Sequence, residues 1–354
     1  MTIIIFILVL LVTVIAHEWG HFYVARKSGM TVEEFGFGIP PRLFSWKKGG
    51  TTYSINALPI GGFVKIAGEN GFEDPAIDAT PKDKQFESKP WYLKSAVLVA
   101  GVVCNILLAI VLFTVAYAIG MPVAMEGGTP TVINVVSGSP AAKSGLEVGD
   151  VITGVSVGSA AIAAAPSTET VHDAIVANDG NVVLSVKRGN KDVPFTIVPE
   201  GTGSARVIGI AIEPVSQQRL PLFRAFTAAV QQTISMAGQI FSTLGSLIAG
   251  IFTPNNTASA LVGPVGLAKE VGSAASIGFT YLLAFTAAIS VNLAVLNIMP
   301  FPALDGGRLV VVLLEAITKR KFSQKTVGII HAIGFIVLLG LMVFLTVGDV
   351  RKLF

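Results

Sequence analysis

The chain has 354 residues, of which 52% are hydrophobic and 13% are charged, and its mean hydropathy is +0.71. This composition excludes an ordinary soluble protein and indicates a protein that crosses a membrane several times. The net charge of +3 is spread along the chain without a basic tract, so we expect no nucleic-acid partner. The single cysteine, Cys104, excludes an intramolecular disulfide and is expected to be a small packing residue.

The first apolar run extends from about residue 2 to residue 24 and is followed by Arg26 and Lys27. It lacks the basic start and the small-residue cleavage site of a signal peptide, so we predict a retained membrane span. The basic pair indicates that this end of the span is cytoplasmic and that the N-terminus lies outside.

The last part of this run contains the sequence His17-Glu18-Trp19-Gly20-His21. On a helix, histidines four residues apart lie on one face, so both imidazoles can bind one Zn²⁺ ion while the glutamate reaches a metal-bound water. The alternative is an ordinary pair of interfacial histidines. Polar side chains at membrane depth are costly when they face lipid, which favours a functional interior.

Three further apolar stretches, at about residues 94–119, 278–298 and 327–347, are long enough to cross a bilayer. The stretch 222–252 is ambiguous, because it is long and apolar but carries several glutamine, serine and threonine residues. We interpret it as an amphipathic segment at the membrane surface, which leaves four spans and places both termini outside. The basic loop 299–326 then lies on the cytoplasmic side.

The longest polar insert, residues 124–214, is predicted to be a small β-rich domain. Residues 129–136 and 182–186 are typical of strands, and a helix is expected from about Thr168 to Ala177. The alanine-rich segment 160–165 is expected to be a surface loop.

A second β-element is predicted in the loop between the first two spans. Segments 52–55 and 63–66 flank Pro59 and the pair Gly61-Gly62, a pattern typical of a hairpin with a tight turn. Its largely uncharged residues suggest that it touches the membrane domain, and a plain surface hairpin is the alternative.

A catalytic zinc ion needs a third protein ligand and an open position for water. His172 falls in the insert on the other side of the membrane, and His331 lies in the fourth span, where a packed histidine is the ordinary explanation. Asp305 remains, after prolines that end the third span and before two glycines that allow close backbone approach. The alternative role for Asp305 is an N-cap of the helix that begins at Gly306.

Two asparagines, Asn292 and Asn297, lie on the third span, where polar side chains are costly if they face lipid. They could bond neighbouring helices only. Alternatively, Asn297 could hold the substrate backbone or the developing oxyanion, because it is close to the ligand loop.

Taken together, these motifs resemble the site-2 protease family of intramembrane zinc metalloproteases. The chain is most similar to the bacterial regulator-of-sigma-E protease type, with one PDZ domain where other members have two. The matching segments follow the family order along nearly the whole chain: HEWGH (17–21), GFGIPPRL (36–43), YSINALPIGGFVKIAGE (53–69), SGSPAAKSGLEVGDVI (137–152), LVGPVGLA (261–268) and NLAVLNIMPFPALDGGRL (292–309).

The resemblance implies that His17, His21 and Asp305 bind zinc and that Glu18 is the general base. It also implies that the hairpin at 51–66 receives the unwound substrate strand. The candidate substrate-binding residues are Asn297, Asn292, Tyr53, Ile55, Gly61 and Gly62.

The implied fold is an α-helical polytopic membrane protein with four spans, a membrane-associated β-hairpin and an inserted PDZ domain. Residues 1–123 form an N-terminal membrane half, 124–214 the PDZ domain, 215–277 an amphipathic connecting region, and 278–354 a C-terminal membrane half. The PDZ domain and both termini are expected outside the cell inner membrane, with the active site near the cytoplasmic face.

The predicted function is a membrane metalloendopeptidase that uses Zn²⁺ to cleave single-span membrane proteins, such as anti-sigma-factor-like substrates or signal-peptide remnants. We expect another protease to trim the outer part of these substrates first, and membrane lipid is the other expected partner. The alternative is a catalytically inactive membrane scaffold whose PDZ domain binds peptide termini. Nothing in the sequence indicates an impaired Glu18, which favours the enzyme.

Overall fold

The computed structural model describes residues 2–69, 80–136, 138–158, 160–176, 180–189, 191–201, 206–250 and 263–351. The chain forms two compact units, which are described separately. One comprises Met1–Val115, Phe223–Gly272 and Leu283–Phe354, and the other comprises Ala116–Leu222 and Ser273–Leu282.

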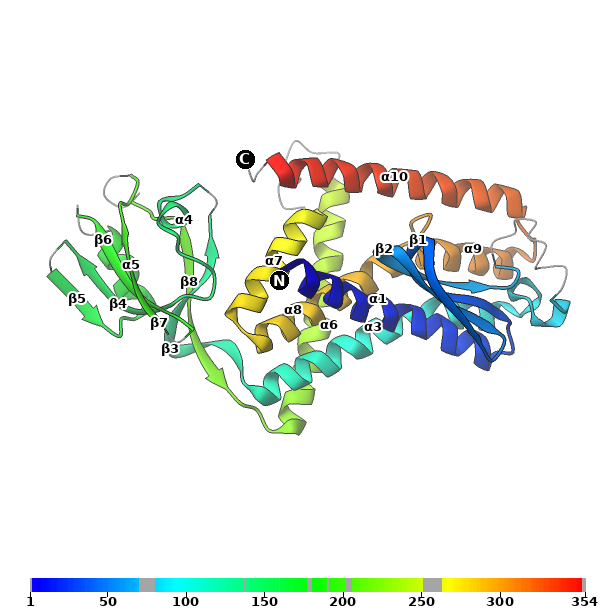
Figure 1. Ribbon diagram of the computed structural model, residues 1–354, viewed down its shortest axis with the longest axis horizontal. Helices are drawn as coiled ribbons and strands as arrows, with labels where there is room; N and C mark the ends of the chain where they lie inside the picture. Colours follow the sequence, from blue (N-terminus) through cyan, green and yellow to red (C-terminus); the bar gives the residue numbers. More distant parts are fainter. Residues whose placement is uncertain are drawn as a thin grey trace. The chain divides into compact units, whose positions relative to one another are not determined.

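Within the described ranges, four helices are long and apolar enough to cross a membrane, as predicted. They are α1 (Thr2–Lys27), α3 (Trp91–Ile119), α8 (Phe279–Ile298) and α10 (Gln324–Arg351) (Figure 1). The helix α6 (Leu222–Gly250) is not among them, which agrees with the amphipathic interpretation of 222–252.

The remaining helices are short. They are η1 (Lys82–Lys84), η2 (Phe86–Ser88), α4 (Pro140–Ser144), α5 (Thr168–Val176), α7 (Pro264–Ile277) and α9 (Asp305–Thr318).

One face of α1 packs against protein, because its buried residues recur every three or four positions: Val9, Thr13, His17, Gly20 and His21. At Gly20 the backbone of α3 approaches so closely that a β-carbon would overlap the carbonyl oxygen of Ala100. Small residues at such crossings allow helices in a membrane to pack tightly. The part of α1 that carries the metal-binding motif is therefore packed tightly against α3.

The predicted β-element is a sheet of two long strands, β1 (Val32–Lys48) and β2 (Thr51–Ile66). The reversal expected around residues 59–62 is present, because the partners of β1 residues 34–37 rise from Thr52 to Ile55 in one register and fall from Lys65 to Gly62 in the other. The direct pairing of 52–55 with 63–66 that a simple hairpin requires is wrong, because both segments pair with β1, which lies between them. Phe35, for example, pairs with both Tyr53 and Val64. The chain reverses at Gly49-Gly50, where both residues have the positive φ angles that glycine tolerates (60° and 86°).

An apolar cluster connects this sheet to the helices of its unit. Phe22 of α1, Val32 and Ile66 of the sheet, Leu98 of α3 and Val312 of α9 are all buried in it. The cluster fixes β2 beside the end of α1 that carries the histidines.

The insert is a six-stranded sheet with the helices α4 and α5. Its strands are β3 (Met121–Val135), β4 (Val151–Val157), β5 (Ala160–Ala164), β6 (Val182–Arg188), β7 (Lys191–Ile197) and β8 (Ile210–Gln218). Along the sheet the order is β7-β6-β4-β3-β8, and β5 pairs with β4. The core contains Val132, Ile152, Val171, Leu184 and Ile197.

Two expectations for the insert were wrong. The sheet extends beyond residues 124–214, because β3 and β8 pair from Met121↔Gln218 onwards. The alanine-rich segment is the strand β5 and not a surface loop, since alanines 160, 161, 163 and 164 pair with β4. Backbone pairing compensates there for the low strand propensity of alanine.

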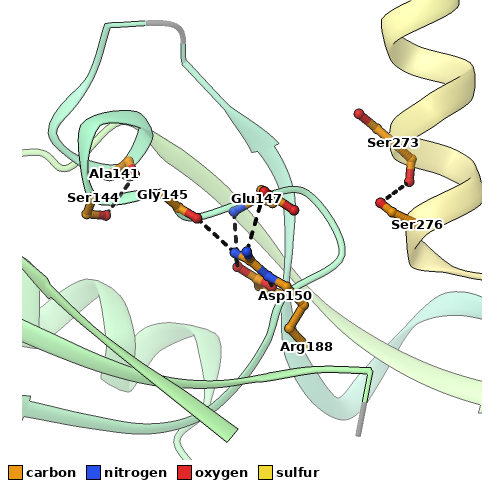
Figure 2. A network of polar contacts seen from close by, with 8 residues as sticks. All are labelled: Ala141, Ser144, Gly145, Glu147, Asp150, Arg188, Ser273 and Ser276. Atoms are coloured by element: carbon orange, nitrogen blue, oxygen red, sulfur yellow. Dashed lines mark hydrogen bonds and ion pairs between the residues drawn. The ribbon is translucent and has the colours of Figure 1, made fainter. Parts of the chain in front are cut away.

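An ion pair with a buried carboxylate anchors the loop between α4 and β4 (Figure 2). The carboxylate of Asp150, whose side chain is 1% exposed, accepts hydrogen bonds from Nε and Nη2 of Arg188 at 2.7 Å and from the amide of Glu147 at 3.0 Å. Arg188 Nη2 also donates to the carbonyl of Gly145 at 2.9 Å. The hydrogen bond and charge of Asp150 raise the pKa of Arg188, which therefore stays charged.

Candidate metal centre

Three side chains from distant parts of the sequence converge between α1 and α9. His17 and His21 lie one turn apart on α1, and Asp305 is the first residue of α9. Asp305 Oδ2 lies 3.0 Å from His17 Nε2 and 3.2 Å from His21 Nε2, and the two Nε2 atoms are 3.1 Å apart. Among the described residues, His17, His21 and Asp305 form the group of at least three His, Cys, Asp or Glu side chains whose potential metal-binding atoms all lie within 4.8 Å of one another.

The spacing of these atoms fits a tetrahedral zinc site. Zinc binds histidine nitrogen and carboxylate oxygen at about 2.0–2.2 Å, which places neighbouring tetrahedral ligands about 3.3–3.6 Å apart. The three observed separations lie close to this range. Two imidazoles and one carboxylate are also a donor set that leaves a fourth position open.

The orientation of His21 is fixed from its far side. Its Nδ1 donates a hydrogen bond to the backbone carbonyl oxygen of Val97 at 2.8 Å, which leaves Nε2 with its lone pair toward His17 and Asp305. The Nδ1 atom of His17 is buried and has no hydrogen-bond partner among the described residues.

Space for the two rings comes from Gly101 on α3. A β-carbon at this position would overlap His21 Nε2 and would lie 2.7 Å from His17 Cε1. The sequence reading did not single out this residue, and the one available signal was a glycine inside an apolar helix.

The carboxylate of Asp305 is free to bind metal, because it does not cap α9. The N-cap residue is Leu304, with no side-chain hydrogen bond to the helix, so the N-cap alternative for Asp305 is wrong. Burial opposes ionisation of Asp305, but hydrogen bonds with His17 and His21 hold its pKa below the ordinary value. The carboxylate is therefore ionised at neutral pH.

A cavity of about 540 Å³ adjoins the three ligand residues. Glu18, Asn297, Gly61 and Gly62 line it, together with the last residues of β2. A β-carbon on Gly62 would lie 3.0 Å from Glu18 Cγ, so a glycine at this position lets the strand pass close to Glu18. The glutamate thus faces the same space as the ligands without belonging to the ligand group.

Other predicted site residues lie outside the cavity lining. Tyr53 packs against Phe22 of α1 and against Phe35 and Trp46 of the sheet. Ile55 is exposed on β2, and Asn292 is exposed on α8.

The two remaining histidines are not ligands. His172 is exposed on the insert. His331 on α10 accepts a hydrogen bond from the amide of Ala303 and is not in the ligand group, so the alternative third ligand is excluded among the described residues.

Two charged residues on the cavity wall were missed as site residues. Arg308 of α9 forms an ion pair with Glu69, and both line the cavity. From the sequence, the basic loop 299–326, which contains Arg308, served only as evidence for the side of the membrane, and Glu69 was assigned no role. The two residues are 239 positions apart in the sequence, so no local sequence pattern could have revealed their ion pair.

Comparison with known proteins agrees with this geometry. The family model "Peptidase family M50" matches residues 5–341. The chain is 33% identical to a protein of Clostridium acetobutylicum over 98% of this chain and 97% of the relative. It is 34% identical to a protein of Clostridium perfringens over 95% of each chain, and 30% identical to one of Nostoc over 98% and 95%.

All three relatives carry the name "Putative zinc metalloprotease". The family match covers the HEWGH segment, the insert and the Asp305 loop alike. The chain therefore belongs to peptidase family M50, the site-2 proteases, and is a membrane metalloprotease that uses zinc.

Proposed function

We propose that this protein is an intramembrane endopeptidase that cleaves single-span membrane proteins near the cytoplasmic face. The observation that carries the proposal is the convergence of His17, His21 and Asp305 beside Glu18, at the basic end of a candidate membrane span. A hydrolytic centre at that depth meets a substrate segment that itself lies in the membrane.

Each residue has a role that follows from its chemistry. His17, His21 and Asp305 hold the metal, and zinc supplies Lewis-acid activation of the scissile carbonyl and of the attacking water. Glu18 takes the proton of that water and passes it to the leaving amine, because it faces the cavity and is not a ligand. Asn297, on the same cavity wall, donates a hydrogen bond to the substrate carbonyl.

The last part of β2 is suited to receive an unwound substrate. Among the described residues, Gly62, Phe63 and Val64 pair with β1 on one side only, and these same residues line the cavity. A helical substrate must unwind before cleavage, and pairing with this free edge replaces its lost hydrogen bonds. Gly61 and Gly62 leave room for the incoming backbone, whereas Tyr53 and Ile55 shape the sheet further from the metal.

Topology follows from the four spans and the basic segments. Arg26 and Lys27 at the end of α1 and the basic residues around 319–325 favour a cytoplasmic position for the loops that carry the metal site. Both termini and the insert then lie outside the inner membrane. The six-stranded sheet with two helices is compatible with a PDZ domain, and we assign it that role.

The substrates that fit this arrangement are single-span proteins whose outer part another protease has removed, such as anti-sigma-factor-like proteins or signal-peptide remnants. A catalytically inactive scaffold is the competing function. It is disfavoured because Glu18, the ligand group and the cavity are all present.

The test compares the membrane proteomes of cells expressing the wild type or Glu18→Gln. We expect single-span proteins, or their membrane-embedded remnants, to accumulate in the variant. Identical proteomes, with both proteins expressed equally and loaded with zinc, would support the scaffold instead.

A further inference from the structure

The loop between α8 and α9 leads directly to Asp305, and most of its backbone hydrogen bonds are internal. The amide of Phe301 donates to the carbonyl of Met299 at 2.7 Å, and the amide of Leu304 donates to Phe301 at 3.1 Å. Ala303 is different: its φ angle is 79°, and its amide donates to Nδ1 of His331 on α10 at 2.9 Å. A non-glycine residue in this conformation persists only where the surroundings hold it.

A second contact from α10 reaches the same loop. Gly334 lies three residues after His331, on the same face of the helix. A β-carbon at Gly334 would lie 2.6 Å from Cβ of Pro302. The helix therefore packs directly on the loop backbone, and His331 supplies the polar contact at this junction.

We propose that His331 is a positioning residue for the zinc site. Its Nδ1 accepts the amide hydrogen of Ala303 and so fixes the direction in which Asp305, two residues later, presents its carboxylate to His17 and His21. This inference rests on the proposed role of Asp305 as a metal ligand.

This hydrogen bond requires Nδ1 of the His331 ring to be the acceptor. To accept from Ala303, Nδ1 must be unprotonated, so the ring carries its proton on Nε2. When no acceptor is present, the partly buried amide of Ala303 loses the contact that holds this residue at its positive φ angle, and the loop relaxes to another conformation. Since the loop leads directly into α9, this change moves Asp305 away from the two imidazoles.

The test measures zinc affinity of the full-length protein in detergent by competition with a chelator. Asparagine places its Oδ1 close to the position of histidine Nδ1, so His331→Asn keeps an acceptor, whereas His331→Leu removes it. We expect His331→Leu to weaken zinc binding about 10- to 100-fold, the usual range for residues that orient metal ligands. His331→Asn is expected to stay within about threefold of wild type on the same reasoning.

The exposed His172 provides the matched control, because His172→Leu makes the same chemical change on the insert. It should leave zinc affinity unchanged. Activity gives the second readout: His331→Leu should lower kcat with little effect on KM for a single-span substrate, and His331→Asn should restore kcat.

Equal zinc affinities in His331→Leu and wild type would overturn the proposal, as would equal losses in the leucine and asparagine variants. If the leucine variant does not fold, His331→Gln replaces it, because glutamine carries its oxygen one bond further from the backbone. The proposal then requires weaker zinc binding by His331→Gln than by His331→Asn, and equal binding refutes it. A wild type that binds no zinc refutes the proposed function as well.

Discussion

Gly101 of α3 lies directly against the imidazole of His21 on α1, so that a β-carbon at position 101 would overlap His21 Nε2. That nitrogen is one of the two imidazole nitrogens that converge on Asp305 Oδ2. Because position 101 of α3 carries no side chain, the two histidines have the space they need to bind a metal ion. The geometry of the metal site therefore depends on how closely α1 and α3 pack.

The first prediction is that Gly101→Val strongly lowers zinc content and abolishes proteolysis. The side chain would displace both rings, because a β-carbon already overlaps His21 and lies 2.7 Å from His17. Metal content of the purified protein measures the effect. The matched control is Gly340→Val on α10, where a β-carbon meets no atom within 4 Å; it should keep wild-type zinc content.

The second prediction concerns Glu18→Gln. Proteolysis of a single-span substrate should fall by at least about 10²-fold, because the amide cannot take a proton from water. Zinc content and thermal stability should stay near wild type, because Glu18 is not in the ligand group. Loss of zinc in this variant would show that Glu18 helps to bind the metal, and the assigned roles would have to be revised.

The third prediction is that Asp305→Ala lowers zinc affinity, because it removes one of three protein ligands. Asn297→Ala is the control, since Asn297 lines the same cavity without belonging to the ligand group. It should keep its zinc and lose activity. Wild-type zinc affinity in Asp305→Ala would mean that another group completes the site.

The sequence was sufficient for features that depend on local patterns. Spans follow from apolar length, and the spacing of His17 and His21 places them on one helical face whatever the rest of the chain does. Asp305 could be selected because the chain has only four histidines, because topology removed His172, and because packing in the fourth span was the ordinary explanation for His331.

The errors concern contacts between segments that are distant in sequence or lack a strong local signal. The reversal near Gly61-Gly62 could be predicted, but no local pattern indicated that β1 lies between segments 52–55 and 63–66, where Phe35 pairs with both Tyr53 and Val64. The alanines of β5 have low strand propensity and become a strand through β4. Similarly, Ala303 lies in a loop, and its hydrogen-bond partner His331 lies 28 residues later on α10.

The fourth prediction tests sidedness and therefore the exclusion of α6 as a span. Ser185 and Ser323 are both exposed, so a single cysteine can be introduced at either position in a Cys104→Ala background. An impermeant thiol reagent should label Ser185→Cys from outside the cell and Ser323→Cys only after the membrane is opened. Labelling of both from one side would contradict four spans and would separate the Asp305 loop from His17.

The last prediction concerns the insert, which contributes no residue to the ligand group or to the cavity lining among the described residues. We expect it to restrict access, because a compact domain on the outer side would exclude substrates with bulky outer parts and admit trimmed ones. In the test, residues 121–218 are replaced by a short Gly/Ser linker, and an untrimmed and a pre-trimmed single-span substrate are compared.

Restricted access predicts that the untrimmed substrate becomes cleavable while the trimmed substrate is cut at a rate similar to that in the wild type. The control is Arg188→Met in the full-length protein, which leaves the buried carboxylate of Asp150 without its arginine partner and so destabilises the insert without deleting it. It should relax substrate selection in the same direction, although less completely. If both substrates lose cleavage in a deletion variant that still folds and binds zinc, the insert is instead a docking site that turnover requires.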